Sequence, residues 1–327
     1  MQVFSFQYSV FSGRLLWENR GVKRCPRIVL ISLACGVAFV STLHSAQDVD
    51  PVYHGKSLAQ WLDAANGSAR GTLENEAARL AIQEIGTNGL PYLVKALANG
   101  HSVSRDTPIP MGESNAKDDP AKVTIVLRQG LTAADARAAS AAYGFYVLGP
   151  AASPAVPALA SLLNQSNKIV STRAMEALVE IGKEGIPPLI AVLKDEQHAN
   201  RGFASFCIRK MCMRPSTRTN MAVELPVVMR CLKDKDKSVV APAAAALGLL
   251  RLEPGICVPA LADLLKHTDW SVRQNAADSL RRFGEDARPA LPALLSALHD
   301  PARLVRMEAT NTIRNIAPEV LEKLARR

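Results

Sequence analysis

Apolar residues recur along this chain at the spacing of helix faces. One set lies three or four residues apart, which places its members on a single face of a helix. It comprises Val272, Ala276, Leu280 and Phe283. With a period of about 33 residues, the same set recurs earlier (Val239, Ala243, Leu247, Leu250) and later (Val305, Ala309, Ile313, Ile316). Because no sustained alternation of Val, Ile and Thr accompanies this pattern, it predicts an all-α fold built from internal repeats.

A proline marks a second helix in each repeat. Copies of a Leu/Val/Ile-Pro motif lie at Pro91, Pro157, Pro187, Pro226, Pro259 and Pro292. Proline suits the first turn of a helix, where its missing N–H would have no partner. Glycines such as Gly86 and Gly182 precede these helices and suit the left-handed end of the helix before. The sequence therefore predicts an α-α superhelix, a solenoid of stacked antiparallel helix pairs.

The order of these features resembles the HEAT-repeat family. An Ala/Leu-rich helix, Gly, a Val-Pro-x-Leu helix and Asp follow one another over residues 74–327, in about seven units. The stretch 51–62 is similar to the start of the mature part of secreted bacterial HEAT proteins. Its Leu58, Trp61 and Leu62 form one apolar stripe, which suits a helix that caps the stack. The resemblance implies that the second helices line a concave surface.

The chain divides into three predicted parts. Residues 1–46 are an N-terminal extension with a signal peptide or membrane anchor, and residues 47–73 are a linker and N-terminal capping helix. Residues 74–327 are the HEAT-like solenoid. An irregular segment at 100–134, with a short helix expected near 123–128, interrupts it, and a degenerate unit with a long turn follows at 195–222.

The N-terminal part has the layout of a secretory signal. Lys23, Arg24 and Arg27 precede an apolar stretch at 28–43, and Ala46 provides a small residue for cleavage. We therefore expect export to the periplasm or the exterior, with membrane anchoring by residues 28–43 as the alternative.

Charge adds little to this picture. The formal net charge is +9, and residues 47–327 keep 34 basic against 29 acidic residues, an excess of +5. This mild excess does not by itself imply nucleic acid. The arginine-rich C-terminal helices, with Arg273 and Arg306 in register, leave a nucleic-acid binder as the second alternative function.

The sequence contains no motif that carries catalysis or holds a cofactor. It has no Walker loop, no G-x-S-x-G and no H-E-x-x-H, and its histidines are scattered singly. No Cys-x-x-Cys pair is present, so no metal site is predicted. The cysteines of the repeats are interpreted as buried thiols, and export leaves open a disulfide from Cys207 or Cys212 to Cys231. Some HEAT-like proteins are lyases or their accessories, and such a role is the first alternative function.

One register carries a row of basic or titratable side chains, which we call the cation row. The residue seven positions after the repeat proline is Lys194, Lys233, Lys266 or His299 in four units, and Arg230 lies one turn before Lys233. Lysines at helix C-termini also interact favourably with the helix dipole, which explains the row without a partner. The alternative is a surface that binds an acidic protein or peptide. We expect a non-catalytic interaction scaffold, with no nucleic acid bound and membrane contact only through the N-terminal segment.

Overall fold

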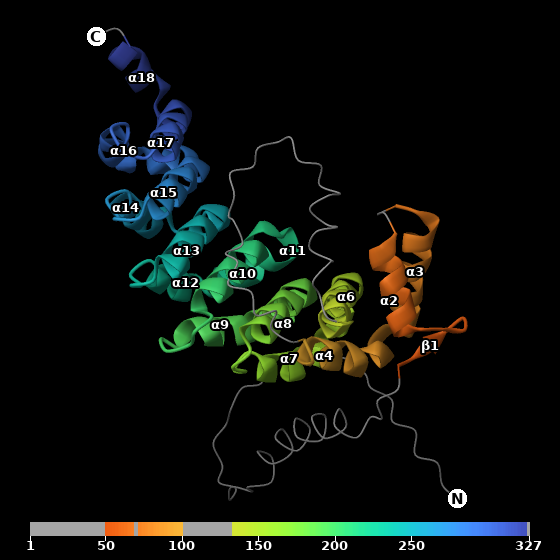
Figure 1. The fold of residues 1–327 in the computed structure, drawn as a ribbon. Coiled ribbons are helices and arrows are strands. Elements are labelled where there is room, and N and C mark those ends of the chain that lie inside the picture. The colour runs from red at the N-terminus through yellow and green to blue at the C-terminus, as the bar shows by residue number, and fades with distance from the viewer. Residues whose placement is uncertain (1–49, 69–70, 101–132, 326–327) are drawn as a thin grey trace, which may run out of the picture. The chain divides into compact units, whose positions relative to one another are not determined.

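The computed structural model describes residues 50–68, 71–100 and 133–325 (Figure 1). The targeting segment, most of the irregular segment 100–134 and the short helix expected near 123–128 lie outside the described residues. The described part belongs to the compact unit Ala46–Arg327.

A small hairpin precedes the first helix. Strands β1 (Val52–Tyr53) and β2 (Lys56–Ser57) pair antiparallel, and the turn between them uses left-handed backbone at His54 and Gly55. Helix α2 (Leu58–Gly67) follows, with a capping box formed by Ser57 and Gln60. The strands are too short for their alternation to show in the sequence. Along α2, Leu58 and Leu62 are buried, in agreement with the predicted stripe.

Seven helix pairs make up the rest of the described chain. Their first helices are α3 (Leu73–Ile85), α6 (Ala133–Leu148), α8 (Lys168–Ile181), α10 (Arg201–Met213), α13 (Lys237–Leu250), α15 (Trp270–Phe283) and α17 (Arg303–Ile316). Their second helices are α4 (Leu90–Ala98), α7 (Val156–Leu162), α9 (Ile186–Lys194), α12 (Leu225–Cys231), α14 (Pro254–Leu264), α16 (Leu291–Ala297) and α18 (Pro318–Ala325). The all-α solenoid of about seven units is therefore confirmed.

Short segments join the two helices of a pair. Four are 3-10 turns, η1 (Gly86–Gly89), η2 (Gly149–Ala155), η3 (Lys183–Gly185) and η4 (Gly284–Ala290). The long turn predicted in the degenerate unit is instead a helix, α11 (Pro215–Ala222). Pro215 begins it, because proline is tolerated in a first turn, and the buried Met221 and Thr217 anchor it.

The predicted position of the repeat proline is correct in five of the six copies. These five stand in the first turn of α4, α7, α9, α12 and α16. The prediction for Pro259 is wrong, since this residue lies inside α14, which begins more than one turn earlier at Pro254. The turn before α14 is tight, and Arg251 and Glu253 adopt the left-handed backbone that glycine adopts in other repeats.

Successive first helices pack against one another through small residues and buried hydroxyls. The Ser279 hydroxyl donates to the Ala244 carbonyl at 2.9 Å, and Thr312, at the equivalent position of the next repeat, donates to Ala277 at 2.8 Å. A Cβ on Gly248 would lie 2.6 Å from the Cα of Ser279, so only glycine permits this approach. These contacts join α13 to α15 and α15 to α17 along their lengths.

Ion pairs also link adjacent repeats at their turns. Arg273 donates to both carboxylate oxygens of Asp300, at 2.6 and 2.8 Å, with both side chains largely buried. Lys237 contacts Asp269 at 2.7 Å, and Arg201 pairs with Asp234. Each pair joins a first helix to the turn that opens the next one, which fixes the register of the stack.

The stretch Ala136–Leu162 has the length and composition of a membrane-spanning segment, alone among the residues that the structure describes. It covers most of α6 and all of η2 and α7, which contact α4 and α8. Its buried side chains, such as Phe145 and Leu159, belong to the core of the stack. Core helices of this kind satisfy the same criteria as membrane spans.

Candidate interaction surface

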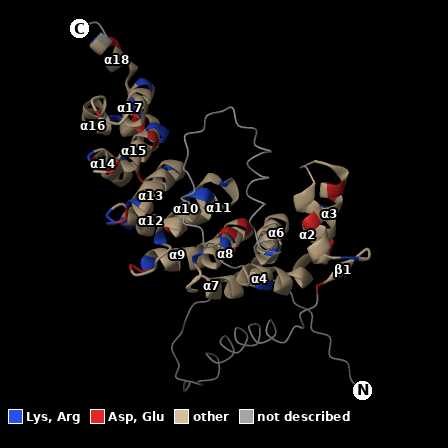
Figure 2. Cartoon of the chain, viewed as in Figure 1, with Lys and Arg blue, Asp and Glu red and all other residues tan. Residues whose placement is uncertain are grey.

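The predicted cation row lies at equivalent ends of four second helices. Lys194 ends α9, Lys233 and Lys266 lie two residues beyond α12 and α14, and His299 lies two residues beyond α16. Arg230 belongs to the last turn of α12. All five side chains are exposed, and none forms an ion pair within the part of the chain that is described. Figure 2 shows basic positions in the turns beside α9 and α12.

Two carboxylates near the row, Asp234 and Asp269, are already engaged in the turns. Burial opposes ionisation of Asp234, but the Asp236 backbone N–H and the Arg201 guanidinium lower its pKa overall. Hydrogen bonds from Lys237 and Ser271 lower the pKa of Asp269. These carboxylates hold helix starts and neighbouring repeats together, so they do not form direct pairs with Lys233 or Lys266.

The two helix layers differ in how closely they pack. The first helices from α10 to α17 lie against one another along much of their lengths, whereas consecutive second helices touch much less. The first helices are therefore the tighter layer. That the second helices line a concave surface stays a prediction, as does the binding role of the cation row.

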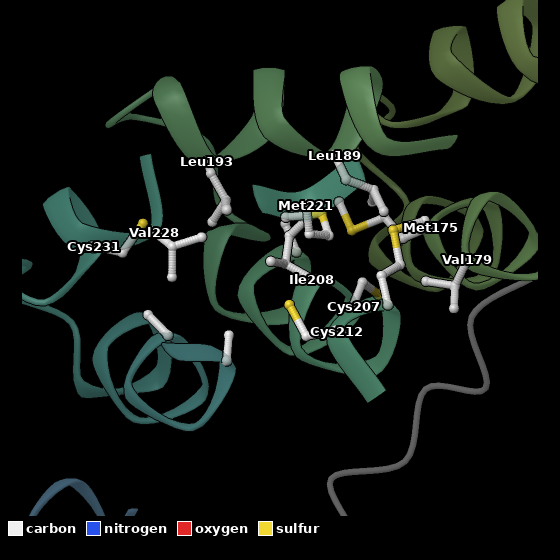
Figure 3. Packing of buried hydrophobic residues seen from close by; sticks show 14 of the residues in the cluster. Met175, Val179, Leu189, Leu193, Cys207, Ile208, Cys212, Met221, Val228 and Cys231 are labelled. Carbon is white, nitrogen blue, oxygen red and sulfur yellow. The ribbon is translucent and has the colours of Figure 1, made fainter. Parts of the chain in front are cut away.

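The four cysteines of the described repeats are free buried thiols. The disulfide considered from the sequence, Cys207 or Cys212 with Cys231, is not formed in the structure. In Figure 3 Val228 and Leu193 lie between Cys231 and the two α10 cysteines. Burial raises the pKa of Cys207 and of Cys212 to about 12, and both pack as small apolar groups.

Two histidines are structural parts of the turns. The Nδ1 atom of His198 accepts from the Asn200 N–H at 3.1 Å, and that of His267 accepts from the Asp269 N–H at 3.0 Å. Each fixes the backbone just before a first helix. Within the residues described, His, Cys, Asp and Glu form no group of three or more that could hold a metal ion.

A second, partly exposed surface was missed by the sequence analysis. It is the face of α10 formed by Phe206, Arg209, Lys210 and Met213, which we call the α10 face. Phe206 is 37% exposed and Met213 is 53% exposed. The signal was present, since these positions follow the spacing of one helix face, but the unit that holds them was interpreted as degenerate.

Comparison with known families identifies the repeat unit. The HEAT repeats model matches residues 225–314, and the PBS lyase HEAT-like repeat model matches residues 172–195. No curated protein matches the chain.

Several solved structures are similar to this chain. An engineered protein is 16% identical, with 80% of this chain and 96% of that one covered and a TM-score of 0.44. The complex of CpcE and CpcF of phycocyanin lyase from Nostoc sp. PCC7120 is 20% identical, with 48% and 97% covered and a TM-score of 0.40. A designed armadillo repeat protein in complex with the peptide (KR)4 is 16% identical, with 80% and 99% covered and a TM-score of 0.43.

The matched residues coincide with pairs seen in the structure. Residues 225–314 run from the start of α12 through α16 and nearly to the end of α17, and residues 172–195 cover most of α8 and all of α9. Over these residues the chain consists of HEAT repeats, stacked as an all-α solenoid.

Proposed function

We propose that this chain is a non-catalytic interaction scaffold that binds an acidic protein or peptide. One observation carries the proposal, namely an exposed lysine at an equivalent turn of three consecutive repeats, with the exposed His299 at that position in the fourth. A solenoid repeats its surface at a fixed interval, so equivalent positions can contact successive parts of an extended partner. The cations Lys194, Lys233 and Lys266 form no ion pair among the described residues, and the carboxylates Asp234 and Asp269 are engaged elsewhere.

We further propose that the scaffold acts outside the cytoplasm. The basic, apolar and small-residue sequence of residues 23–46 supports export to the periplasm or exterior. In the alternative arrangement, residues 28–43 stay uncleaved and hold the scaffold at the membrane. Sequencing the N-terminus of the protein purified from its cells distinguishes the two, since a terminus near 47 requires cleavage.

A role as an enzyme accessory is the second candidate. The match of residues 172–195 to the PBS lyase HEAT-like repeat favours it, although the match covers a single repeat unit. Its test is a change in the rate of a partner enzyme when the scaffold is added, which binding alone does not produce.

The experiment that tests the scaffold measures binding of a fluorescein-labelled oligoglutamate peptide by anisotropy. The variant Lys194→Glu/Lys233→Glu/Lys266→Glu reverses the row and is expected to weaken binding about tenfold or more. The control Lys183→Glu/Arg314→Glu/Lys323→Glu makes the same change in net charge at exposed positions outside the row. Equal weakening by both variants would reduce the effect to overall charge and refute a role for the row.

A further inference from the structure

The α10 face combines exposed apolar side chains with partly buried cationic ones on one helix surface. Phe206, Arg209, Lys210 and Met213 are spaced by three, four and seven residues, so they share one face of α10. The ring of Phe206 lies against that of Phe203, with centroids 5.8 Å apart. This contact holds the exposed ring in place, which favours its use as an anchor for a partner.

The apolar surface continues onto α13. Ser205 donates from α10 to the Val239 carbonyl at 2.8 Å, and Gly202 approaches Ser238 so closely that a Cβ would collide. This register sets the outward positions of the two helices side by side. On α13 those positions are partly exposed and carry no charge; they are Ala241, Pro242 and Leu249.

The chain segment that runs from α10 to the start of α13 carries an excess of positive charge. Residues 201–237 contain nine basic and three acidic residues, a net charge of +6. Ion pairs engage Arg201, Arg214 and Lys237. Among the described residues, Arg209 and Lys210 form no ion pair, and the buried Nε of Arg209 has no hydrogen-bond partner. The charges of Arg209 and Lys210 are therefore not neutralised by an ion pair among the described residues.

Helix α15 pairs its charges internally, and α10 does not. On α15, Asp278 pairs with both Arg281 and Arg282 within the same helix. On α8, Glu176 faces Lys210 across the repeats. Burial raises the pKa of Glu176, against the opposing effect of Lys210 and Arg173. Glu176 is a single carboxylate and leaves Arg209 without an ionic partner.

We propose that the α10 face, with the adjoining surface of α13, binds an acidic partner segment that carries aromatic or aliphatic side chains. Phe206 and Met213 supply apolar contact, and Arg209 and Lys210 bind the carboxylates. The inference rests on the proposed scaffold function and names the surface and chemistry that it uses. It places the anchoring site in the layer of first helices, separate from the cation row at the ends of the second helices.

The test uses the full chain and three labelled peptides of equal length. The first repeats Glu-Glu-Phe-Ser, the second replaces its Phe by Ser, and the third replaces its Glu by Lys. We expect the first peptide to bind at least about tenfold more tightly than either of the others, because it alone offers both kinds of contact. The variant Phe206→Ser/Lys210→Glu is expected to lose that preference.

The matched control is Tyr146→Ser/Lys183→Glu, which changes an exposed aromatic and an exposed lysine on other repeats. It should bind the first peptide as the parent chain does. Circular dichroism and thermal unfolding of both variants exclude loss of fold as the cause. Parent-like binding by Phe206→Ser/Lys210→Glu overturns the inference, as does equal binding of all three peptides.

The variant with the cation row reversed separates the scaffold proposal from the α10 inference. If reversal of Lys194, Lys233 and Lys266 abolishes oligoglutamate binding while the α10 variant binds every peptide as the parent does, the scaffold stands and the α10 inference fails. If the α10 variant alone loses binding, the anchoring site is confirmed and the row is refuted.

Discussion

Removal of one carboxylate should uncouple the C-terminal repeat from the stack. Asp300 receives two hydrogen bonds from Arg273, at 2.6 and 2.8 Å, and a third from the Ala302 N–H at 2.8 Å. The side chains of Arg273 and Asp300 are only 10% and 7% exposed. In Asp300→Ala the guanidinium stays buried with only the carbonyls of His267 and Thr268 as acceptors.

The expected cost is about 3–5 kcal/mol, the range for leaving one member of a buried ion pair uncompensated. Asp300→Asn retains an acceptor for the Ala302 N–H and should cost less. Lys237→Ala is the matched control, because its bridge to Asp269 also joins adjacent repeats but the lysine is 66% exposed. Exposed bridges contribute little, so this variant should unfold close to the parent.

The assay is urea unfolding combined with hydrogen exchange. In a solenoid each repeat contacts only its neighbours, so the damage should be local. Amides of α17 and α18 should exchange faster in Asp300→Ala, while those of α8 and α9 keep their rates. Uniform acceleration along the chain, or a loss of stability no larger than that of Lys237→Ala, would refute the reasoning.

Lowering the pH should remove the stability that the Arg273–Asp300 ion pair contributes. The hydrogen bonds from Arg273 are the main reason why the pKa of Asp300 is lowered in the folded chain. A lowered folded pKa means that the stabilisation is complete above the unfolded pKa of about 4 and is lost as the pH falls through the folded value. The gap in stability between the parent and Asp300→Ala should therefore narrow below about pH 4.

Three further predictions concern backbone and thiols. Arg251→Gly should raise the free energy of unfolding by about 1 kcal/mol, measured in urea, because Arg251 occupies left-handed backbone at φ 54°. Gly248→Ala should lower it by about 1–3 kcal/mol through collision with α15, whereas Gly255→Ala, with nothing within 4 Å of the new Cβ, should not lower it. Cys207 and Cys212 should resist iodoacetamide at pH 8 in the folded chain and react in urea, as followed by peptide mass spectrometry, because burial raises their pKa to about 12.

The periodic part of the fold was predictable because its causes are local. Helix faces such as Val272, Ala276 and Leu280 recur from one repeat to the next, and all three are buried against neighbouring repeats. Proline in the first turn and glycine at helix ends act through backbone conformation alone. Pro259 shows the limit, since the motif is intact but the missing glycine near Arg251 changes where the helix begins.

The two candidate surfaces also differ in whether they follow the repeat period and can therefore be predicted from the sequence. The cation row follows the repeat and was found by counting from each proline. The α10 face does not follow it, because α11 lengthens the unit, so that equivalent residues of α10 and α13 lie further apart than the repeat period. A comparison of residues 33 positions apart therefore aligns Phe206 with Val239, which is buried. In the structure Phe206 and Pro242 occupy the equivalent outward positions of α10 and α13. The irregular unit interrupts the period on which sequence comparison between repeats depends, although Arg201 of this unit still pairs with Asp234 as the regular units do. The unit of α10 to α12 is the one for which the sequence was least informative. Within the described part of the chain, its Arg209 has no ionic partner and lies on the same helix face as the exposed ring of Phe206.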